Sequence, residues 1–250
     1  MRPVADHYRA DRPTRDVKCT EAVEWLKGQQ NSSLGNVFAS FPDLSELPRG
    51  SNWKQKSKSE QRDAVVYYKK WFEDTVRLCL QKTKADGYVV LYQTDRKSSG
   101  EWISKASLAN RAACAEGWSL RWRKIALRSD DIANKDTLHP TYSNVMCFSK
   151  TASPGDSSPS FMYRGAMNWD CATGQEAARF VLKFIHTYSP NRVVYDPFVG
   201  KGTTIALANS FGLDAVGIEI DEERCKEAKK LQLGGGGSSS DAPEVMVQGL

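Results

Sequence analysis

The stretch VVYDPFVGKGTTIALANSFGLDAVGIEID, residues 193–221, restricts the fold more than any other part of the chain. It reads as an apolar strand, a turn that contains Gly200 and Gly202, a helix and a second apolar strand. Two glycines let a backbone turn pass close to a ligand, and the N-terminus of the following helix favours a polar or anionic group. The stretch therefore predicts a ligand-binding turn at one edge of a sheet.

The chemistry around this turn suits a nucleoside. The first strand delivers Asp196 and Pro197 to the turn, the helix begins at about Thr203, and the second strand ends in Glu219. A carboxylate at the end of that second strand can accept hydrogen bonds from both hydroxyls of a ribose. The turn is not GxGxxG and carries a DPF prefix, which argues against NAD. GxxxxGK[ST] is also missing from the sequence, so ATP hydrolysis is not expected.

The rest of the chain alternates apolar strand patterns with helical periods. Strands are predicted at 36–41, 87–95, 119–127 and 144–150, and helices at 19–28, 62–83, 107–118, 175–188 and 222–233. Alternation of this kind predicts an α/β fold, with a mostly parallel sheet covered by helices on both faces.

Composition limits the class of protein. No run of about 18 apolar residues and no signal-peptide pattern occurs, so we expect no membrane span and an intracellular protein, cytoplasmic or nuclear. Six cysteines lack any CxxC spacing and only three histidines occur, so we expect free thiols, no disulfide framework and no metal site. The formal net charge of +5 permits nucleic-acid binding without requiring it.

The strand at 36–41 ends in an unusual way. It runs into Ser40, Phe41, Pro42 and Asp43, with no ordinary turn residue such as glycine or asparagine. One interpretation is that the strand ends at a working site. The other is that proline stops the strand and the aspartate caps the loop that follows.

Two further clusters carry candidate substrate contacts. Trp53, Lys54 and Lys56 combine a ring with cations, as proteins that bind single-stranded nucleic acid do, but a solvated loop has the same composition. Asp95 and Arg96 follow the predicted strand 87–95 and should emerge at the sheet edge where α/β sites lie. The alternative interpretation is that Asp95 and Arg96 lie in an ordinary connecting loop.

The segment DPFVGKGTT…GLDAVGIEID resembles the S-adenosylmethionine-binding half of the adenine-N6 and cytosine-N4 DNA methyltransferase superfamily. The likeness extends loosely over Thr14 to Leu231 and implies a Rossmann-like class I methyltransferase. Catalytic elements precede the cofactor motif, which is the circularly permuted order of that superfamily. We expect a single domain at 14–231, between a flexible N-terminus at 1–13 and a flexible tail at 232–250. Within the domain, a catalytic half at 14–150 is joined to a cofactor half at 161–231 by a Ser/Pro/Gly loop at 151–160.

The resemblance also implies a cofactor site for S-adenosyl-L-methionine. By analogy, Glu219 holds the ribose, and Glu21, where the family usually has Asp, faces the adenine. The other expected cofactor-binding residues are Thr173, Asp196, Pro197, Phe198, Gly200, Gly202 and Thr203.

The same analogy assigns a role to the end of strand 36–41. In the superfamily this strand ends in [Asp/Asn/Ser]-Pro-Pro-[Tyr/Phe/Trp], which holds the target amine and stacks on the base. Ser40 and Pro42 fit, whereas Phe41 replaces the first proline and Asp43 replaces the aromatic. Stacking would then come from another ring, Phe41 itself or Trp53. Asp43 is interpreted either as a general base or as a loop cap.

These observations predict a methyltransferase that acts on nucleic acid. RNA, as a tRNA or rRNA base, is favoured over DNA, because the chain has little spare length for a domain that reads DNA sequence. One alternative is a DNA adenine-N6 or cytosine-N4 methyltransferase. Another is a catalytically silent subunit that binds cofactor or RNA, with a protein partner or a second copy of the chain.

Overall fold

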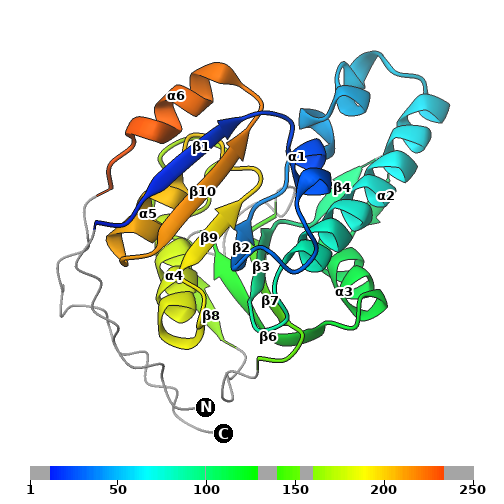
Figure 1. Cartoon of the computed structure of the whole chain (residues 1–250). Helices are drawn as coiled ribbons and strands as arrows, with labels where there is room; N and C mark the ends of the chain where they lie inside the picture. The colour runs from blue at the N-terminus through cyan, green and yellow to red at the C-terminus, as the bar shows by residue number, and fades with distance from the viewer. Residues whose placement is uncertain (1–11, 99, 129–139, 153–159, 234–250) are drawn as a thin grey trace, which may run out of the picture.

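The computed structural model describes residues 12–98, 100–128, 140–152 and 160–233, which form an eight-stranded sheet with helices on both faces (Figure 1). The expected flexible ends, 1–13 and 232–250, and the expected loop 151–160 lie mostly outside the described residues. None of the helices in the described ranges is long and apolar enough to cross a membrane.

The elements have these bounds. The strands of the large sheet, in its spatial order, are β1 (Arg15–Cys19), β10 (Asp214–Glu219), β9 (Val193–Asp196), β2 (Asn36–Ala39), β3 (Val89–Gln93), β7 (Tyr142–Ser149), β6 (Ser119–Leu127) and β8 (Phe161–Tyr163). A separate hairpin consists of β4 (Arg96–Ser98) and β5 (Glu101–Ile103). The α-helices are α1 (Ala22–Gly28), α2 (Lys58–Lys82), α3 (Lys105–Ala115), α4 (Gln175–Tyr188), α5 (Thr203–Ser210) and α6 (Glu222–Lys230). The 3₁₀ helices are η1 (Leu44–Glu46), η2 (Pro48–Gly50) and η3 (Trp53–Gln55).

The strand order places a switch point in the middle of the sheet. The first five strands, from β1 to β3, are parallel, β7 is antiparallel to both of its neighbours, and β8 is parallel to β6. β9 and β2 are adjacent, but the chain leaves β9 towards β10 and leaves β2 towards β3 on the other side. Because crossovers diverge there, the carboxyl ends of these two strands open a crevice, which is where α/β proteins bind ligands.

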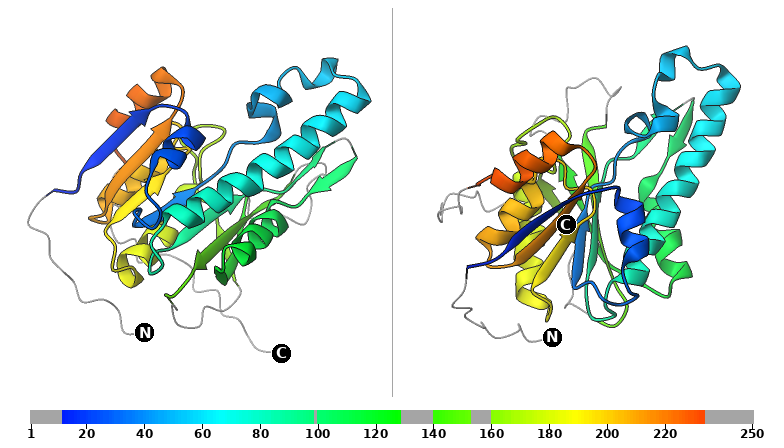
Figure 2. Two further views of the ribbon diagram at one scale, coloured as in Figure 1. Left: turned by 45° about the vertical axis from the view of Figure 1, so that its right-hand side comes forward. Right: turned by 45° about the horizontal axis from the view of Figure 1, so that its top comes forward.

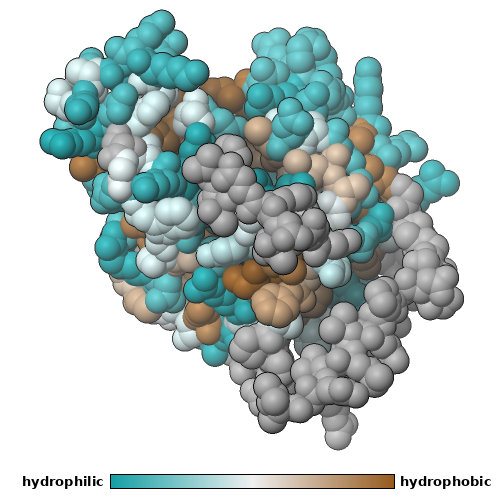
Figure 3. Space-filling view, turned by 180° about the vertical axis from the view of Figure 1, so that it is seen from behind, coloured by the Kyte–Doolittle hydropathy of each residue, from teal (hydrophilic) through white to brown (hydrophobic). Residues whose placement is uncertain are grey.

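Two hydrophobic cores hold the layers together. One core packs α4, α5 and α6 against one face of the sheet, and the other packs α1, α2 and α3 against the opposite face (Figure 2). The back of the molecule is mostly hydrophilic, with small apolar patches (Figure 3). The predicted α/β class, with helices on both faces of a mostly parallel sheet, is confirmed.

Helix α2 begins earlier than its apolar pattern indicates. The periodic residues start near 62, but a capping box sets the start at Lys58: the Glu60 N–H bonds the Ser57 hydroxyl at 3.3 Å, and the Ser57 N–H bonds the Glu60 carboxylate at 2.7 Å. Four residues of polar sequence are therefore helical because their first N–H groups are satisfied.

Strand β1 has no counterpart among the predicted elements. Its sequence RDVKC buries only Val17, because β1 lies at the edge of the sheet and pairs with β10 alone. A strand with one buried side chain produces no apolar run, so periodicity does not reveal it. The three-residue strands of the β4–β5 hairpin and β8 were missed for the same reason.

The expectation of free thiols is wrong for two cysteines. Cys19, at the end of β1, forms a disulfide with Cys225 of α6, although 206 positions separate them in sequence. Pairing of β1 with β10 brings the two residues together. The spacing of the cysteines in the sequence does not indicate that these two are close in space. The other cysteines in the described ranges are free: Cys79, Cys114, Cys147 and Cys171.

Candidate active site

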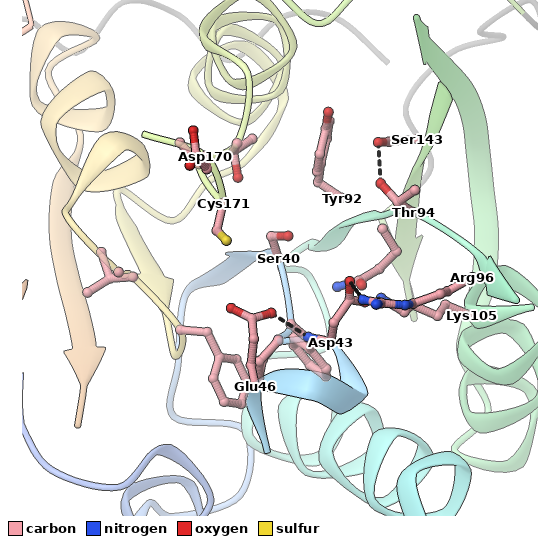
Figure 4. Close-up of a pocket in the computed structure, with 18 of the residues that line it drawn as sticks. Ser40, Asp43, Glu46, Tyr92, Thr94, Arg96, Lys105, Ser143, Asp170 and Cys171 are labelled. Atoms are coloured by element: carbon pink, nitrogen blue, oxygen red, sulfur yellow. Dashed lines mark hydrogen bonds and ion pairs between the residues drawn. The ribbon is translucent and has the colours of Figure 1, made fainter. Parts of the chain in front are cut away.

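A cavity of about 1050 Å³ opens at the switch point, over the carboxyl ends of β9, β10, β2 and β3. It continues past the sheet to the β4–β5 hairpin and to the first residues of β7. Figure 4 shows Ser40 between two groups of lining residues, with Asp170 and Cys171 on one side and Arg96 and Lys105 on the other. The cavity thus extends to both sides of Ser40.

Asp196 lies at the base of one end of the cavity. It is only 3% exposed, and its Oδ1 accepts a hydrogen bond from the Phe198 N–H at 3.1 Å. Burial raises the pKa of Asp196 to about 7, and the nearby charge of Glu219 adds to the increase, against the effect of the hydrogen bonds that it accepts. A buried carboxyl of this kind is suited to meet a cationic ligand.

The glycine turn after Asp196 is closely packed. Gly200 and Gly202 have φ of +55° and +93°, in the region that favours glycine. A Cβ on Gly200 would come within 2.6 Å of the Trp169 ring. That ring also has the Arg224 guanidinium 5.2 Å and the Lys201 ammonium 6.0 Å from its centroid. Trp169 therefore covers the turn from outside the sheet.

Two further carboxylates line this end. Glu219, at the end of β10, is mostly buried, and its Oε1 accepts hydrogen bonds from the N–H groups of Ile220 at 3.0 Å and Asp221 at 2.9 Å. Glu21 caps α1, with its Oε2 accepting from the Glu24 N–H at 2.7 Å. Both carboxylates are held by backbone donors while they face the cavity.

Every residue predicted to bind cofactor lies in or directly beside this end. The cavity-lining members are Glu21, Thr173, Asp196, Pro197, Phe198, Gly200, Thr203 and Glu219. Gly202 stands behind them at the N-terminus of α5, where its own Cβ would come within 2.7 Å of the Ala228 backbone. The glycine turn, the buried acid and the two oriented carboxylates fit a cationic ligand that carries a ribose.

The four residues after β2, Ser40 to Asp43, all line the middle of the cavity. Phe41 is only 3% exposed, and its ring packs 4.8 Å from the Phe198 ring and 5.3 Å from the Phe72 ring, centroid to centroid. Phe41 is thus a core residue whose ring is enclosed by other rings, which leaves little of it for a base to stack on.

Asp43 is held by two cations. Its carboxylate pairs with Arg96 at 2.9 Å and with the ammonium group of Lys105, whose side chain is only 3% exposed. Burial alone would raise the pKa of Asp43, but the charges and hydrogen bonds of Lys105 and Arg96 outweigh it, so the pKa lies below its ordinary value. A carboxylate with a lowered pKa and engaged oxygens is a weaker general base than a free one.

Asp43 also takes part in the start of a helical turn through its backbone N–H. It stands at the N-terminus of η1, where its N–H donates to Glu46 Oε2 at 2.7 Å. The Tyr68 hydroxyl donates to the Pro42 carbonyl at 3.0 Å. These contacts fix the loop after β2 in one position.

The predicted substrate residues separate in the structure. Asp95 and Arg96 line the cavity; Asp95 is buried and accepts from the Ser104 hydroxyl and the Ala106 N–H, both at 3.3 Å, at the start of α3. Trp53, Lys54 and Lys56 lie on or next to η3 and are not among the residues that line the cavity. The structure therefore joins only the first pair to Ser40 and Asp43.

Several lining residues had no assignment from the sequence. Among them are the buried Lys105 and the residues of the distal end, Lys97, Trp102, Arg128, Tyr142 and Arg164. Arg128 closes the basic run RWRKIALR, which was visible in the sequence, but nothing local shows that it reaches a cavity. Lys105 carries no motif at all; only its burial against Asp43 marks it.

Comparison with known proteins agrees with this geometry. Residues 177–230, from α4 to α6, match the N6_N4_Mtase family model, described as DNA methylase. This segment of the chain is therefore similar to DNA methylases. The family match covers less than half of the chain, and it spans Asp196, the glycine turn and Glu219. No curated protein matches the chain at a significant level.

Solved structures show the same fold over most of the chain. The cytosine-N4-specific PvuII DNA methyltransferase has a TM-score of 0.64 and 16% identity over 88% of either chain. The TTHA0409 protein of Thermus thermophilus, complexed with S-adenosyl-L-methionine, has a TM-score of 0.61 and 18% identity, over 86% of this chain and 93% of that one. The M1.HpyAVI complex with the same cofactor has a TM-score of 0.56 and 15% identity, over 87% and 98%.

The family match supports the predicted methyltransferase class, and two of the structurally similar proteins were solved in complex with S-adenosylmethionine, the expected cofactor. The comparisons also favour DNA, the alternative among the predicted substrates, because the matched family and the PvuII enzyme are DNA methylases. Nothing in them supports RNA.

Proposed function

We propose that the protein transfers the methyl group of S-adenosylmethionine to an exocyclic amino group of DNA, adenine N6 or cytosine N4. The observation that carries the proposal is that Ser40, at the end of β2, lies in the same cavity as Asp196 and Glu219 of the cofactor end. The DNA methylase match at residues 177–230 supports the choice of substrate. This choice replaces RNA, which the sequence favoured.

The residues of the cofactor end hold and orient the donor. Glu219 and Glu21 offer carboxylate oxygens for the ribose and the adenine, and Asp196 places a buried carboxyl near a cationic group. When bound, the cofactor supplies a methyl group on a positively charged sulfur, which is electrophilic. Trp169 packs closely on the glycine turn and narrows this end of the cavity.

The middle of the cavity presents the acceptor. In the transfer, the amine nitrogen would give its lone pair to the methyl carbon as the C–S bond breaks, and would then lose one proton to solvent. Ser40 contributes a hydroxyl that hydrogen-bonds the amine and points its lone pair at the methyl group. Such a displacement depends mainly on positioning, which the packed loop of Phe41 and Pro42 provides.

Asp43 acts in this proposal as a positioning residue. Its contacts with Lys105 and Arg96 tie the loop after β2 to α3 and to the β4–β5 hairpin. An exocyclic amine needs little help from a base, so a carboxylate with a lowered pKa is no obstacle to this chemistry.

The test incubates the purified protein with duplex DNA and with total RNA in the presence of isotopically labelled S-adenosylmethionine, followed by nucleoside mass spectrometry. Labelled N6-methyladenine or N4-methylcytosine from DNA is the expected result. Ser40→Ala should abolish transfer while cofactor binding, measured by calorimetry, is retained, and Ser33→Ala, which changes an exposed serine, should leave both unchanged. Label in RNA alone would overturn the proposal for DNA. Cofactor binding without transfer to any nucleic acid would favour the silent subunit.

A further inference from the structure

The distal end of the cavity has a cation next to an exposed ring on each of its walls. On the first wall, Lys97 and Trp102 face each other across the β4–β5 hairpin. Both line the cavity, and Trp102 is 54% exposed, which is unusual for so large an apolar side chain. Trp102 stands in the middle of the three-residue strand β5, where about half of its surface stays exposed to the cavity and to solvent.

The second wall repeats this combination on other elements. Arg128 follows β6 and Tyr142 begins β7, and the Arg128 N–H bonds the Thr141 carbonyl at 2.9 Å, which holds the two segments together. Tyr142 is 39% exposed and lines the cavity. Arg164 joins them from the end of β8, where its N–H bonds the Leu127 carbonyl at 2.9 Å.

The distal end also carries a surplus of positive charge. The acids that line the cavity next to this end are engaged: Asp43 pairs with Arg96 and Lys105, Asp95 accepts from donors at the start of α3, and Glu46 accepts from the Asp43 N–H. Among the described residues, Lys97, Arg128 and Arg164 have no carboxylate partner, and Nε of Arg164 is buried without a hydrogen bond. By contrast, the cofactor end is acidic. The charges therefore favour a cation at the cofactor end of the cavity and a polyanion at its distal end.

We propose that the distal end holds an unpaired stretch of DNA on both sides of the target base, with Trp102 and Tyr142 as stacking surfaces and Lys97, Arg128 and Arg164 on the phosphates. Rings and cations in alternation suit single strands, because an unpaired base offers its face, whereas the bases of a duplex are stacked on one another. This inference rests on the proposed function and specifies its substrate as single-stranded or locally opened DNA.

The hydroxyl-rich floor between the walls is consistent with such a strand. Thr94 Oγ1 and Ser143 Oγ are 2.6 Å apart, and Tyr92 lies beside them on the same side of the cavity (Figure 4). These groups can donate to base or phosphate oxygens without adding charge. A strand bound on this floor would lie beside Ser40, which lines the same cavity.

The test is fluorescence anisotropy with a labelled single-stranded oligonucleotide, the same sequence as a duplex, and an RNA version. The single strand should bind at least about tenfold more tightly than the duplex. Trp102→Ala and Tyr142→Ala should each weaken single-strand binding by about 5- to 100-fold, the range for loss of one stacked base. Lys97→Gln and Arg128→Gln should each reduce the slope of log K against log salt concentration. The reduction should be the amount expected for the loss of about one phosphate contact.

A matched control is Phe161→Ala, which removes a ring that is 75% exposed on β8 and does not line the cavity. It should leave binding unchanged, and unaltered cofactor binding by every variant shows that each is folded. Equal or tighter duplex binding, or ring variants that bind as well as the wild type, would overturn the inference even if methyl transfer to DNA occurs. Much tighter RNA binding would overturn the assignment to DNA. Ring-dependent single-strand binding without methyl transfer would leave this surface in place and refute the proposed function alone.

Discussion

The raised pKa of Asp196 makes a prediction about stability. In the folded protein this carboxyl titrates at about 7, against 3.8 for an unperturbed aspartate. The folded state therefore holds a proton that the unfolded chain has lost between these two pH values. Because the folded state binds more protons, this group lowers the free energy of unfolding as pH rises from about 4 to about 7.

The size of the effect follows from the two pKa values. Full ionisation of Asp196 in the folded protein costs about 4 kcal/mol relative to the unfolded chain, of which about 2.5 kcal/mol develops between pH 5 and pH 8. Asp196→Asn cannot ionise but keeps an oxygen for the Phe198 N–H. The variant should therefore gain stability relative to the wild type by about 2.5 kcal/mol as pH rises from 5 to 8.

Urea unfolding of both proteins at pH 5, 6, 7 and 8, without cofactor, measures this difference. Comparison of the two proteins removes the contribution of all other titrating groups, since they are common to both. Parallel curves, in which the variant and the wild type change equally with pH, would refute the claim that Asp196 is neutral below pH 7. If the variant instead lost stability relative to the wild type as pH rises, a cation in the folded protein would have to compensate the charge of Asp196.

Three further substitutions test particular contacts. Lys105→Met should lower the free energy of unfolding by about 2–3 kcal/mol, since Asp43 loses its buried partner and keeps only Arg96. Adding Asp43→Asn to this variant should recover part of the loss. No recovery in the double variant would contradict the pairing of Asp43 with Lys105. Ser57→Ala should cost about 1 kcal/mol by removing the cap of α2 in thermal unfolding, and an unchanged melting temperature would argue against the capping box. Cys19→Ser should cost about 2–4 kcal/mol under oxidising conditions and nothing in the presence of a reductant; equal losses in both would show that the disulfide itself contributes little.

The cofactor end was the part of the site best predicted from sequence. Most of its residues belong to a single strand–turn–helix–strand unit, so residues that are close in space are also close in sequence. Asp196 and Glu219 end adjacent parallel strands, which must meet at one edge of a sheet. Local pattern and simple topology were enough there.

The distal end was not predictable in the same way. Lys97, Arg128 and Arg164 come from three separate segments, and the parallel pairing of β8 with β6 brings the last two together. Trp53 and Lys54 had a more suggestive composition but lie away from the cavity. Whether a ring or cation reaches a site depends on strand order, which local periodicity does not contain.

The pairing of β1 with β10 joins the two ends of the described fold. Thr14 and Arg15 enter the sheet beside Asp214 and Ala215, and the Arg15 guanidinium bonds the Leu231 carbonyl after α6. A short linker from residue 233 to residue 12 would therefore close the chain into a ring with little change to its strands. New ends could then be opened between β7 and β8, and the cofactor half would precede the catalytic half with every strand pair kept. The order of the two halves along the gene is thus free to change while the enzyme that they build stays the same.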